Sequence, residues 1–376
     1  MFDQRLWKAS GKLASAGVKL VYWSDGASEY WMKIRFSQRQ IKTRSLTFWL
    51  SLILLFGIDR GTAIGAEAQL IERAKKEGTF LLYTSMNLPD VNQIFDGFRK
   101  RYPFITPKSY TTRSAALLER IVTEARAGKH FADVVQGNAF TLYLLAKRGH
   151  TEPYNSPEAK PYPDSFRDSA GGWVAAYLQL NVIGYNTKLV AKSEAPKGYE
   201  DLLNAKWKGR MGLDDKQYIW FDGILKVMGR EKGLAYFKRL ATQSIHFRSG
   251  NTLLANLLAA GEFGILINAR PEGIDELKQK GAPVEWVAPR PTTANVLPIA
   301  VAKRAQNPNA AKLFMDHMLS EEGQKILSSM SRTPARPGVS ANNPRLSGLE
   351  IAINDPGMAE RFDQVVEQYK NVFALP

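Results

Sequence analysis

The sequence contains no cysteine and only four histidines among its 376 residues. Without a thiol the chain forms no disulfide, no thiolate metal site, no cysteine nucleophile and no thioether-linked lipid anchor. The histidines stand far apart, and no two of them have the i, i+4 spacing of a helical zinc motif; they are His130, His150, His246 and His317. We therefore predict no metal site.

The motifs of common enzyme classes are also missing. There is no G-x-S-x-G elbow, no phosphate-binding P-loop and no dinucleotide fingerprint. A Ser–His–Asp triad stays open, because its members need not be neighbours in sequence, but no residue stands out as nucleophile or base. We expect no catalytic residues and no cofactor, and hence a protein that is not an enzyme.

The excess of basic residues is scattered along the chain. Lys and Arg number 51 against 36 Asp and Glu, a net charge of +15, and beyond residue 66 the counts are 41 and 32, a net charge of +9. Nucleic-acid binding favours a clustered basic stripe with interleaved aromatics, which is absent. We expect no nucleic-acid partner; the charge suits an anionic ligand or an anionic membrane surface.

The amino-terminal region has the order of a secretory signal. A basic segment at 33–44 precedes the apolar run Leu46–Ile58, and small residues follow. The run is shorter than the roughly 20 apolar residues of a membrane span. We predict a signal at 32–66 that is cleaved after Ala66 or Ala68, with an uncleaved anchor as the alternative. Residues 1–31 are interpreted as an upstream extension, with Met32 as the true start.

Beyond the signal, strands and helices alternate. The first run contains the strands Thr79–Thr84, Ile105–Thr111 and Ala132–Gln136 and the helices Leu88–Tyr102 and Ser114–Arg126. This order predicts a parallel sheet with helices on both faces. A loop rich in Pro, Tyr and Ser precedes a second run, which contains strands around Trp173–Tyr185, helices at Trp220–Met228 and Leu234–Ala241, and the strand Phe263–Asn268.

One unit occurs twice: a polar cap, a helix, a glycine, a short apolar strand and a small polar loop. The first copy spans Ser114–Asn138, and the second begins with a helix capped by Ser249 or Asn251. In an open α/β sheet, ligands are held by loops at the carboxyl ends of strands and by helix amino termini. Two such copies predict two similar lobes.

An ordered series of short segments resembles family 1 of the bacterial extracellular solute-binding proteins, in the branch of the ferric-iron-binding and phosphonate-binding receptors of ABC importers. The resemblance covers roughly residues 69–340, and only the series as a whole is specific. The segments are L-Y-T-S, F-R-K-R-Y-P-F-I, A-G-K-H-F-A-D-V-V, Y-N-T, A-P-K-G-Y-E-D-L-L, W-K-G-R-M, A-A-G-E-F, K-G-A-P-V and N-P-N-A-A-K-L-F-M-D-H-M-L-S-E-E-G-Q-K-I-L.

The resemblance implies a two-lobed α/β fold of the type II periplasmic-binding-protein class, with a mainly parallel sheet in each lobe and a hinge of two crossings, near Leu180–Tyr185 and Pro289–Leu297. Lobe 1 would comprise 69–181 and 297–345, because the chain from Val296 on would rejoin it. Lobe 2 would comprise 182–296, and 346–376 would form a helical carboxyl-terminal segment. The lobes would close on a ligand in the cleft.

The resemblance also implies a monomeric receptor in the periplasm that captures a small-molecule ligand and delivers it to the permease subunits of an ABC importer at the inner membrane. Ferric-binding members carry two adjacent tyrosines after the strand that follows A-A-G-E. Here that position holds Ala269 and Arg270, and the loop Ser85–Asn87 lacks the expected histidine. A cation in place of phenolates favours an anionic ligand group.

Arg113 and Arg270 both follow predicted strands, at the ends that face the cleft. A guanidinium matches a carboxylate or phosphonate bidentately, and Ser114 adds a hydroxyl at a helix amino terminus. The structural alternatives are a surface residue beside a helix cap for Arg113 and a salt bridge for Arg270, to Glu272 or Asp275.

The other candidate ligand-binding residues are polar or aromatic. Tyr218 and Trp220 suit stacking or cation–π contact with an amine, which Asp214 or Asp215 would pair; a helix cap and core aromatics are the structural alternative. The remaining candidates offer hydrogen bonds to ligand oxygens or cap the next turn; they are Ser85, Asn87, Asn138 and Asn268.

The sequence thus favours a receptor for an anionic or zwitterionic organic solute, such as a phosphonate, an organophosphate or a carboxylate. Two alternatives stay open: a ferric-iron receptor that uses scattered tyrosines with a synergistic anion, and an exported enzyme on the same fold.

Overall fold

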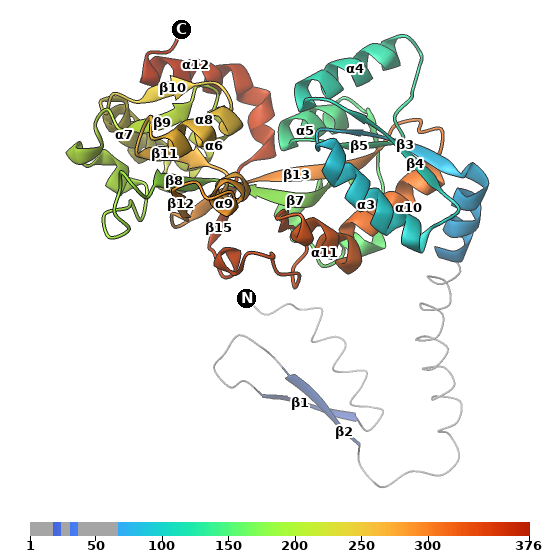
Figure 1. Cartoon of the computed structure of the whole chain (residues 1–376). Coiled ribbons are helices and arrows are strands. Elements are labelled where there is room, and N and C mark those ends of the chain that lie inside the picture. The colour runs from blue at the N-terminus through green and yellow to red at the C-terminus, as the bar shows by residue number, and fades with distance from the viewer. Residues whose placement is uncertain (1–17, 24–30, 37–66) are drawn as a thin grey trace, which may run out of the picture. The chain divides into compact units, whose positions relative to one another are not determined.

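The computed structural model describes residues 18–23, 31–36 and 67–376 (Figure 1). Within the unit Met1–Ala68, β1 (Val18–Trp23) pairs antiparallel with β2 (Trp31–Phe36). The predicted signal run Leu46–Ile58 and the cleavage position Ala66 lie outside the described residues. The unit Gln69–Pro376 contains both lobes.

The first lobe is built on an eight-stranded sheet of order β14-β7-β13-β5-β3-β4, in which β6 and β15 also pair with β13. Its strands are β3 (Thr79–Thr84), β4 (Thr106–Thr111), β5 (Val134–Gln136), β6 (Thr151–Glu152), β7 (Val174–Leu180), β13 (Thr292–Ala302), β14 (Thr333–Pro334) and β15 (Ile351–Ile353). Its helices are residues 67–77, α3 (Leu88–Arg101), α4 (Ser114–Arg126), α5 (Ala139–Lys147), α10 (Pro308–Leu319) and α11 (Glu321–Ser329), with short 3-10 turns η1 (Pro157–Ala159) and η2 (Asp164–Phe166).

The second lobe is built on a five-stranded sheet of order β10-β9-β11-β8-β12. Its strands are β8 (Val182–Asn186), β9 (Met211–Asp214), β10 (His246–Arg248), β11 (Ile265–Ala269) and β12 (Val284–Val287). Its helices are α6 (Tyr218–Met228), α7 (Arg230–Ala241), α8 (Asn251–Ala260), α9 (Pro271–Gln279) and α12 (Phe362–Phe373), with 3-10 turns η3 (Glu200–Leu203) and η4 (Ala205–Trp207).

Three strands at the crossings between the lobes, β7, β8 and β13, turn both sheets from parallel to mixed. β3 pairs parallel with β4 and β5, and β9 pairs parallel with β10 and β11. Every antiparallel pair in the two lobes involves β7, β8 or β13. β7 and β8 are separated by a single residue, Asn181, and β13 returns the chain (Figure 1). The two predicted crossings are therefore present.

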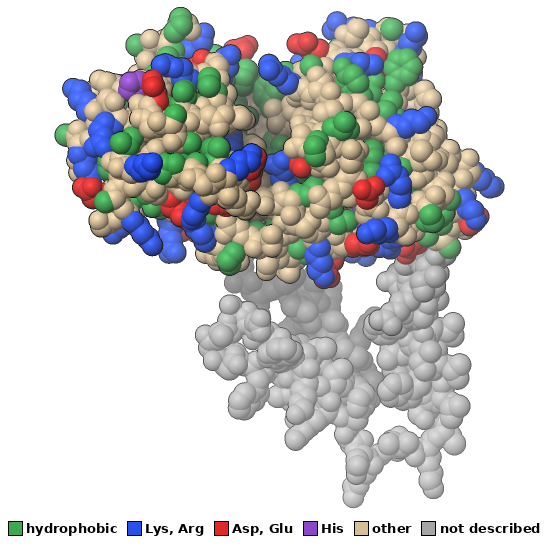
Figure 2. Space-filling model, viewed as in Figure 1, with side chains coloured by type: hydrophobic (Ala, Val, Ile, Leu, Met, Phe, Trp, Pro, Cys, Tyr) green, Lys and Arg blue, Asp and Glu red, His purple; other side chains and the backbone are tan. Residues whose placement is uncertain are grey.

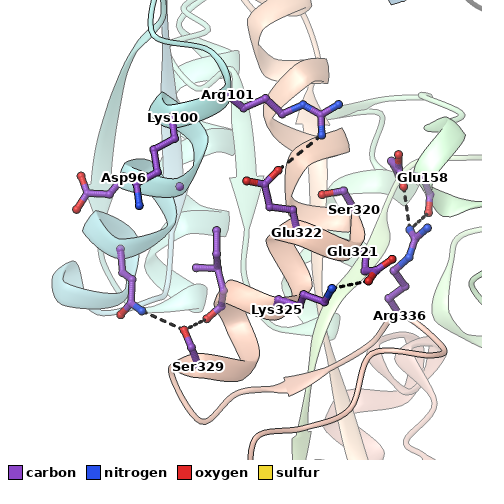
Figure 3. Close-up of a pocket in the computed structure, with 13 residues that line it drawn as sticks. Asp96, Lys100, Arg101, Glu158, Ser320, Glu321, Glu322, Lys325, Ser329 and Arg336 are labelled. Atoms are coloured by element: carbon purple, nitrogen blue, oxygen red, sulfur yellow. Dashed lines mark hydrogen bonds and ion pairs between the residues drawn. The ribbon is translucent and has the colours of Figure 1, made fainter.

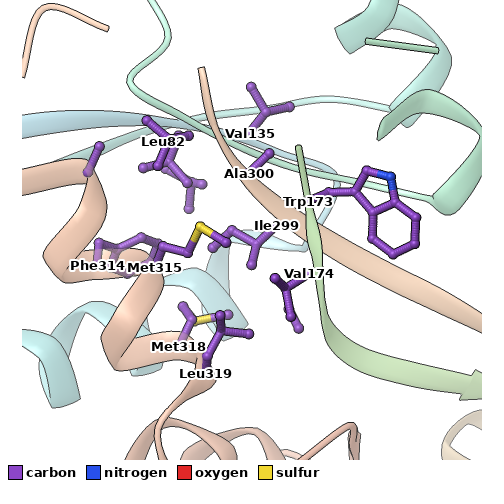
Figure 4. Close-up of a cluster of buried hydrophobic side chains, with 14 of the residues drawn as sticks. Leu82, Val135, Trp173, Val174, Ile299, Ala300, Phe314, Met315, Met318 and Leu319 are labelled. Atoms are coloured by element: carbon purple, nitrogen blue, oxygen red, sulfur yellow. The ribbon is translucent and has the colours of Figure 1, made fainter. Parts of the chain in front are cut away.

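Each lobe has its own apolar core. In the first lobe, α10 packs Phe314 and Met315 against sheet residues such as Leu82 and Ile299, all at most 3% exposed (Figure 4). Aromatic rings meet edge to face around Phe80, which lies 5.6 Å from the ring centre of Phe98. This packing fixes the sheet whose strand ends form one side of the cleft.

The last helix returns to the second lobe. Tyr369 and Phe373 of α12 enter the core of the second lobe, with ring centres 5.4 Å from Phe221 and 5.9 Å from Phe237 respectively. This helix lies within the segment 346–376, which was expected to be a helical carboxyl-terminal segment, and its aromatic face covers α6 and α7 of the second lobe. The connecting turn η6 (Pro356–Arg361) makes a third passage between the lobes.

One local prediction needs correction. The amino-terminal cap of α8 is Gly250, at a φ of 106°, and not Ser249 or Asn251. Ser249 instead donates its hydroxyl hydrogen bond to Asp215, and Asn251 is the first helical residue.

None of the helices that the structure describes has the length and apolar run that a membrane crossing needs.

The packing of α12 yields a stability prediction. Phe373→Ala removes an aromatic side chain that is 7% exposed in the core of the second lobe. We expect a loss of about 3 kcal/mol of unfolding free energy, because a large core side chain leaves a cavity. Urea unfolding of this variant beside Gln364→Ala, on the exposed face of the same helix, measures the effect; equal midpoints would contradict the assigned packing.

A buried histidine in the first lobe yields a pH prediction. His317 is 2% exposed, and neither ring nitrogen has a hydrogen-bond partner among the described residues. Burial, helped by the charge of Arg101, lowers the pKa of His317 to about 4. Between about pH 6.5 and pH 4 this histidine is therefore protonated in the unfolded chain and neutral in the folded chain. The unfolding free energy falls as the pH drops through this range, by about 3 kcal/mol in total. His317→Leu should lose most of this slope in urea titrations across that range, and an unchanged slope would contradict the account.

Candidate functional site

A cavity of about 550 Å³ lies between the lobes, where the carboxyl ends of strands from both sheets meet. Figure 2 shows the corresponding hollow between the two halves of the described molecule. Its walls come from α4 and α5 of the first lobe, from loops and helix starts of the second lobe, from the crossing strands β7 and β13, and from the turn η6. The volume is that of an ordinary small-molecule site.

Five helices begin at the wall of this cavity. The residues at their amino-terminal caps all line it, and they are Arg113 for α4, Asn138 for α5, Gln217 for α6, Gly250 for α8 and Arg270 for α9. Only α5 has a side-chain cap hydrogen bond; the other four have none. Positive helix ends and unshared N–H groups therefore converge on one volume, which favours negative charge there.

Three cationic side chains line the same cavity. Arg113 and Lys216 are exposed, and neither forms an ion pair among the described residues. Arg270 is largely buried and also has no carboxylate partner within salt-bridge distance; one nitrogen donates to the carbonyl oxygen of Leu180 at 3.2 Å and to the side chain of Asn181. The salt bridges to Glu272 or Asp275 that the sequence allowed are absent from the described contacts of Arg270.

The two acidic residues of the lining are already hydrogen bonded. The carboxylate of Asp214 accepts from the backbone N–H groups of Lys216 and Gly250 at 2.9 and 2.8 Å. That of Asp355 accepts from the backbone of Gly357 at 2.9 Å. These carboxylates accept from backbone N–H groups and, among the described contacts, form no ion pair with the three cations of the lining. The cations therefore stay available to a ligand.

Amide side chains supply most of the remaining polar lining. Gln217 donates to Asn251 at 3.3 Å, and Asn354 donates to Asn295 at 2.7 Å. Gln179 and Asn138 complete the set; the oxygen of Asn138 caps α5 at 2.8 Å, which leaves its NH₂ group without a described partner. Such groups donate to and accept from hydroxyls and oxyanions.

The structure brings three of the ten predicted binding residues to the cavity: Arg113, Asn138 and Arg270. Ser114 supports one of them, because its hydroxyl accepts from the backbone N–H of Asn138 at 3.1 Å. Asn268 supports the opposite wall from a position 1% exposed, where it donates to Gln217 at 3.0 Å.

The other five predicted residues lie outside the lining. Trp220 is 1% exposed in the core of the second lobe, against Phe237, and cannot stack on a ligand. Tyr218 packs edge to face on Tyr369, and burial raises its pKa. The remaining three are Asp215, which accepts from Ser249, Asn87, which caps α3, and Ser85, in the loop after β3.

Sequence reasoning missed several lining residues. Lys216 and Gln217 follow β9, and the rule that selected Arg113 and Arg270 also applies to them. Gln179 and Asn295 are polar residues within the apolar crossing strands, a signal visible in the sequence. Asn354 has no local signal, because it reaches the cavity only through the pairing of β15 with β13.

A larger depression, of about 970 Å³, lies on the first lobe between α3 and α11 (Figure 3). Three of its four cationic residues have carboxylate partners: Arg336 with Glu158 at 2.9 Å, Lys325 with Glu321 at 2.5 Å and Arg101 with Glu322 at 3.7 Å. Only one lobe contributes to it. We therefore place the candidate site in the interlobe cavity.

The cavity lacks the usual donors for a transition metal. No tyrosine or histidine belongs to its described lining. In the described part of the chain, no three His, Asp or Glu side chains gather closely enough to hold a metal ion.

Comparison with solved structures shows the same fold. Trichodesmium IdiA (FutA) in complex with iron and citrate superposes with a TM-score of 0.69 at 23% identity, covering 78% of this chain and 99% of its own. AfuA from Actinobacillus pleuropneumoniae, with fructose-6-phosphate bound, has a TM-score of 0.65 at 22% identity, covering 80% and 99%. Both likenesses confirm the predicted two-lobed α/β architecture.

Sequence comparison adds the family. An uncharacterized protein of Haemophilus influenzae is 29% identical over 269 residues, 65% of this chain and 77% of its own. Iron uptake protein A1 of Synechocystis sp. is 24% identical over 296 residues, 73% and 81% respectively. The model of the bacterial extracellular solute-binding protein family matches residues 95–358. Since that match spans parts of both lobes and the cavity between them, the chain belongs to the bacterial extracellular solute-binding proteins, the binding-protein components of ABC importers.

Proposed function

We propose that this protein binds a small organic solute through an anionic group, a phosphonate, phosphate or carboxylate, in the cavity between its lobes. The observation that carries the proposal is the convergence of five helix amino termini and three cations without carboxylate partners on one cavity. An oxyanion offers both the charge and the acceptor atoms that these donors lack.

The cations come from both lobes. Arg113 belongs to the first lobe, while Lys216 and Arg270 belong to the second. A ligand that contacts both sides gains more from a closed cleft than from an open one, and this difference in affinity shifts the population toward closure.

The amide residues indicate a ligand with further polar groups. Gln179, Asn295 and Asn354 lie where the crossing strands and the turn η6 meet the cavity. They suit hydroxyl or amine groups on the body of the solute. Fructose-6-phosphate, which is bound in the AfuA structure, combines an anionic group with hydroxyls; we place sugar phosphates beside phosphonates as the first compounds to test.

Ferric iron is the main alternative, because the names of several relatives refer to iron and one of them to ferric iron. The relative named major ferric iron-binding protein, from Neisseria meningitidis, is 26% identical over 181 residues, and the match covers 54% of its length. Here the described cavity lining holds no phenolate donors and includes Arg270, one of the two residues that stand where a tyrosine pair was expected. Cations repel Fe(III), so we favour the free anion.

The remaining expectations follow from this role. We propose that the protein acts as a monomer, is exported to the periplasm with its signal peptide removed, binds its ligand without turnover, and delivers it to permease subunits at the inner membrane.

Arg113 offers a matched test of anion binding. Arg113→Ala removes a cation at the start of α4, and Arg126→Ala removes one at the last turn of the same helix, so net charge changes equally. Loss of a charge-assisted hydrogen bond should weaken binding of fructose 6-phosphate or methylphosphonate by roughly 10- to 100-fold in the first variant only. Isothermal titration measures this; equal affinities in both variants would remove Arg113 from the site.

Arg270→Lys should weaken binding as well, because lysine keeps the positive charge but loses the bidentate hydrogen bonding of the guanidinium.

A thermal-shift panel separates the alternatives. Phosphonates, sugar phosphates and carboxylates should raise the melting temperature, whereas ferric salts with or without citrate should neither raise it nor colour the protein, since phenolate ligands are missing from the lining. A visible absorption band on adding ferric citrate, with no response to iron-free anions, would overturn the proposed ligand class and favour the iron alternative.

A further inference from the structure

The chain passes from the first sheet to the second through one residue, Asn181, which is 1% exposed. Its backbone N–H donates to the carbonyl oxygen of Thr293 at 2.9 Å. Its side-chain NH₂ group donates to the hydroxyl and the carbonyl oxygen of Thr293, at 2.9 and 3.1 Å. Because Thr293 belongs to β13, the outward crossing is fastened to the return crossing at this point.

The same side chain contacts a residue of the cavity wall, Arg270. The amide oxygen of Asn181 accepts a hydrogen bond from Nη1 of Arg270, and that nitrogen also donates to the carbonyl oxygen of Leu180 at 3.2 Å. Arg270 belongs to the second lobe and lines the cavity. A single guanidinium nitrogen therefore connects the cavity wall to both crossings of the hinge.

The rest of the guanidinium is free of the hinge. Nε of Arg270 is buried and has no acceptor among the described residues. A buried donor without an acceptor is costly, so an oxyanion that accepts from this edge gains more than it would from a solvated arginine. The ligand and the hinge would thus hold opposite sides of one planar, rigid group.

We propose that Asn181 is a positioning residue that links ligand binding at Arg270 to rotation of the lobes; this inference rests on the proposed function. An anion that draws the guanidinium toward itself also draws on Asn181, and Asn181 transmits the displacement to Thr293. Since binding and closure are coupled, the hinge angle in turn sets the position of the guanidinium and hence the affinity.

Adjacent threonines supply a matched pair of variants. Thr292 and Thr293 are both fully buried on β13, but the hydroxyl of Thr292 donates to the carbonyl oxygen of Pro289 and not to Asn181. Thr293→Val removes one acceptor of Asn181, whereas Thr292→Val removes a hydroxyl of the same size beside it. Asn181→Ala removes the whole link. Thermal melts confirm that each variant is folded.

The interlobe distance is measurable with spin labels, because the chain has no native cysteine. Glu119→Cys on α4 and Lys238→Cys on α7 place labels on exposed positions of the two lobes. Double electron–electron resonance then gives the distance distribution with and without saturating fructose 6-phosphate, and with inorganic phosphate as the second probe; titration gives the affinity of each variant.

We expect the wild type and Thr292→Val to shift fully to a shorter distance on binding. Asn181→Ala should bind roughly tenfold more weakly and, even at saturation, lose at least half of that shift; Thr293→Val should lose a smaller part. A full shift at saturation in Asn181→Ala would overturn the link. If neither fructose 6-phosphate nor inorganic phosphate shortens the interlobe distance of the wild type, the proposed function fails for these anions. The distance distributions without ligand then test the proposed link through Asn181. A broader distribution in Asn181→Ala than in Thr292→Val supports it, and identical distributions overturn it.

Discussion

The arrangement depends on positive charge that the protein does not neutralise by itself. Arg113, Lys216 and Arg270 meet at one cavity with the amino termini of five helices, while the carboxylates of Asp214 and Asp355 accept from nearby backbone N–H groups. A cavity in which cations lack carboxylate partners and most helix caps lack side-chain acceptors is complementary to an oxyanion. These groups come from both lobes, with Arg113 on the first lobe and Lys216 and Arg270 on the second.

The strands that cross between the lobes connect the cavity to both sheets. The parallel strands of each sheet end at the cavity, and the strands that cross between the lobes pair antiparallel with them. β7 and β13 contribute residues to the cavity lining, and together with β8 they form the crossings between the lobes. Asn181 connects the crossings to the cavity wall, because it is hydrogen bonded both to Thr293 of β13 and to Arg270.

Much of the fold was predictable from local pattern. Helix and strand periodicity placed β3, α4 and β5 correctly, and the rule that ligands meet strand carboxyl ends selected Arg113 and Arg270. Trp220 was a candidate ligand-binding residue but lies in the core of the second lobe. Its place near the start of a helix does not indicate which face of that helix packs inward. The local pattern could not predict that Asn354 lines the cavity or that α12 packs on the second lobe. Both depend on contacts between residues far apart in the chain, such as the hydrogen bond from Tyr369 to Asp214.

The most direct test of the central claim is the anomalous diffraction of a heavy oxyanion. Crystals soaked in arsenate, a phosphate analogue, should show an arsenic peak between the lobes, within hydrogen-bond reach of Arg270 and bounded by Arg113 and Lys216. Peaks confined to outer surfaces at saturating arsenate, with the interlobe cavity empty, would contradict the account.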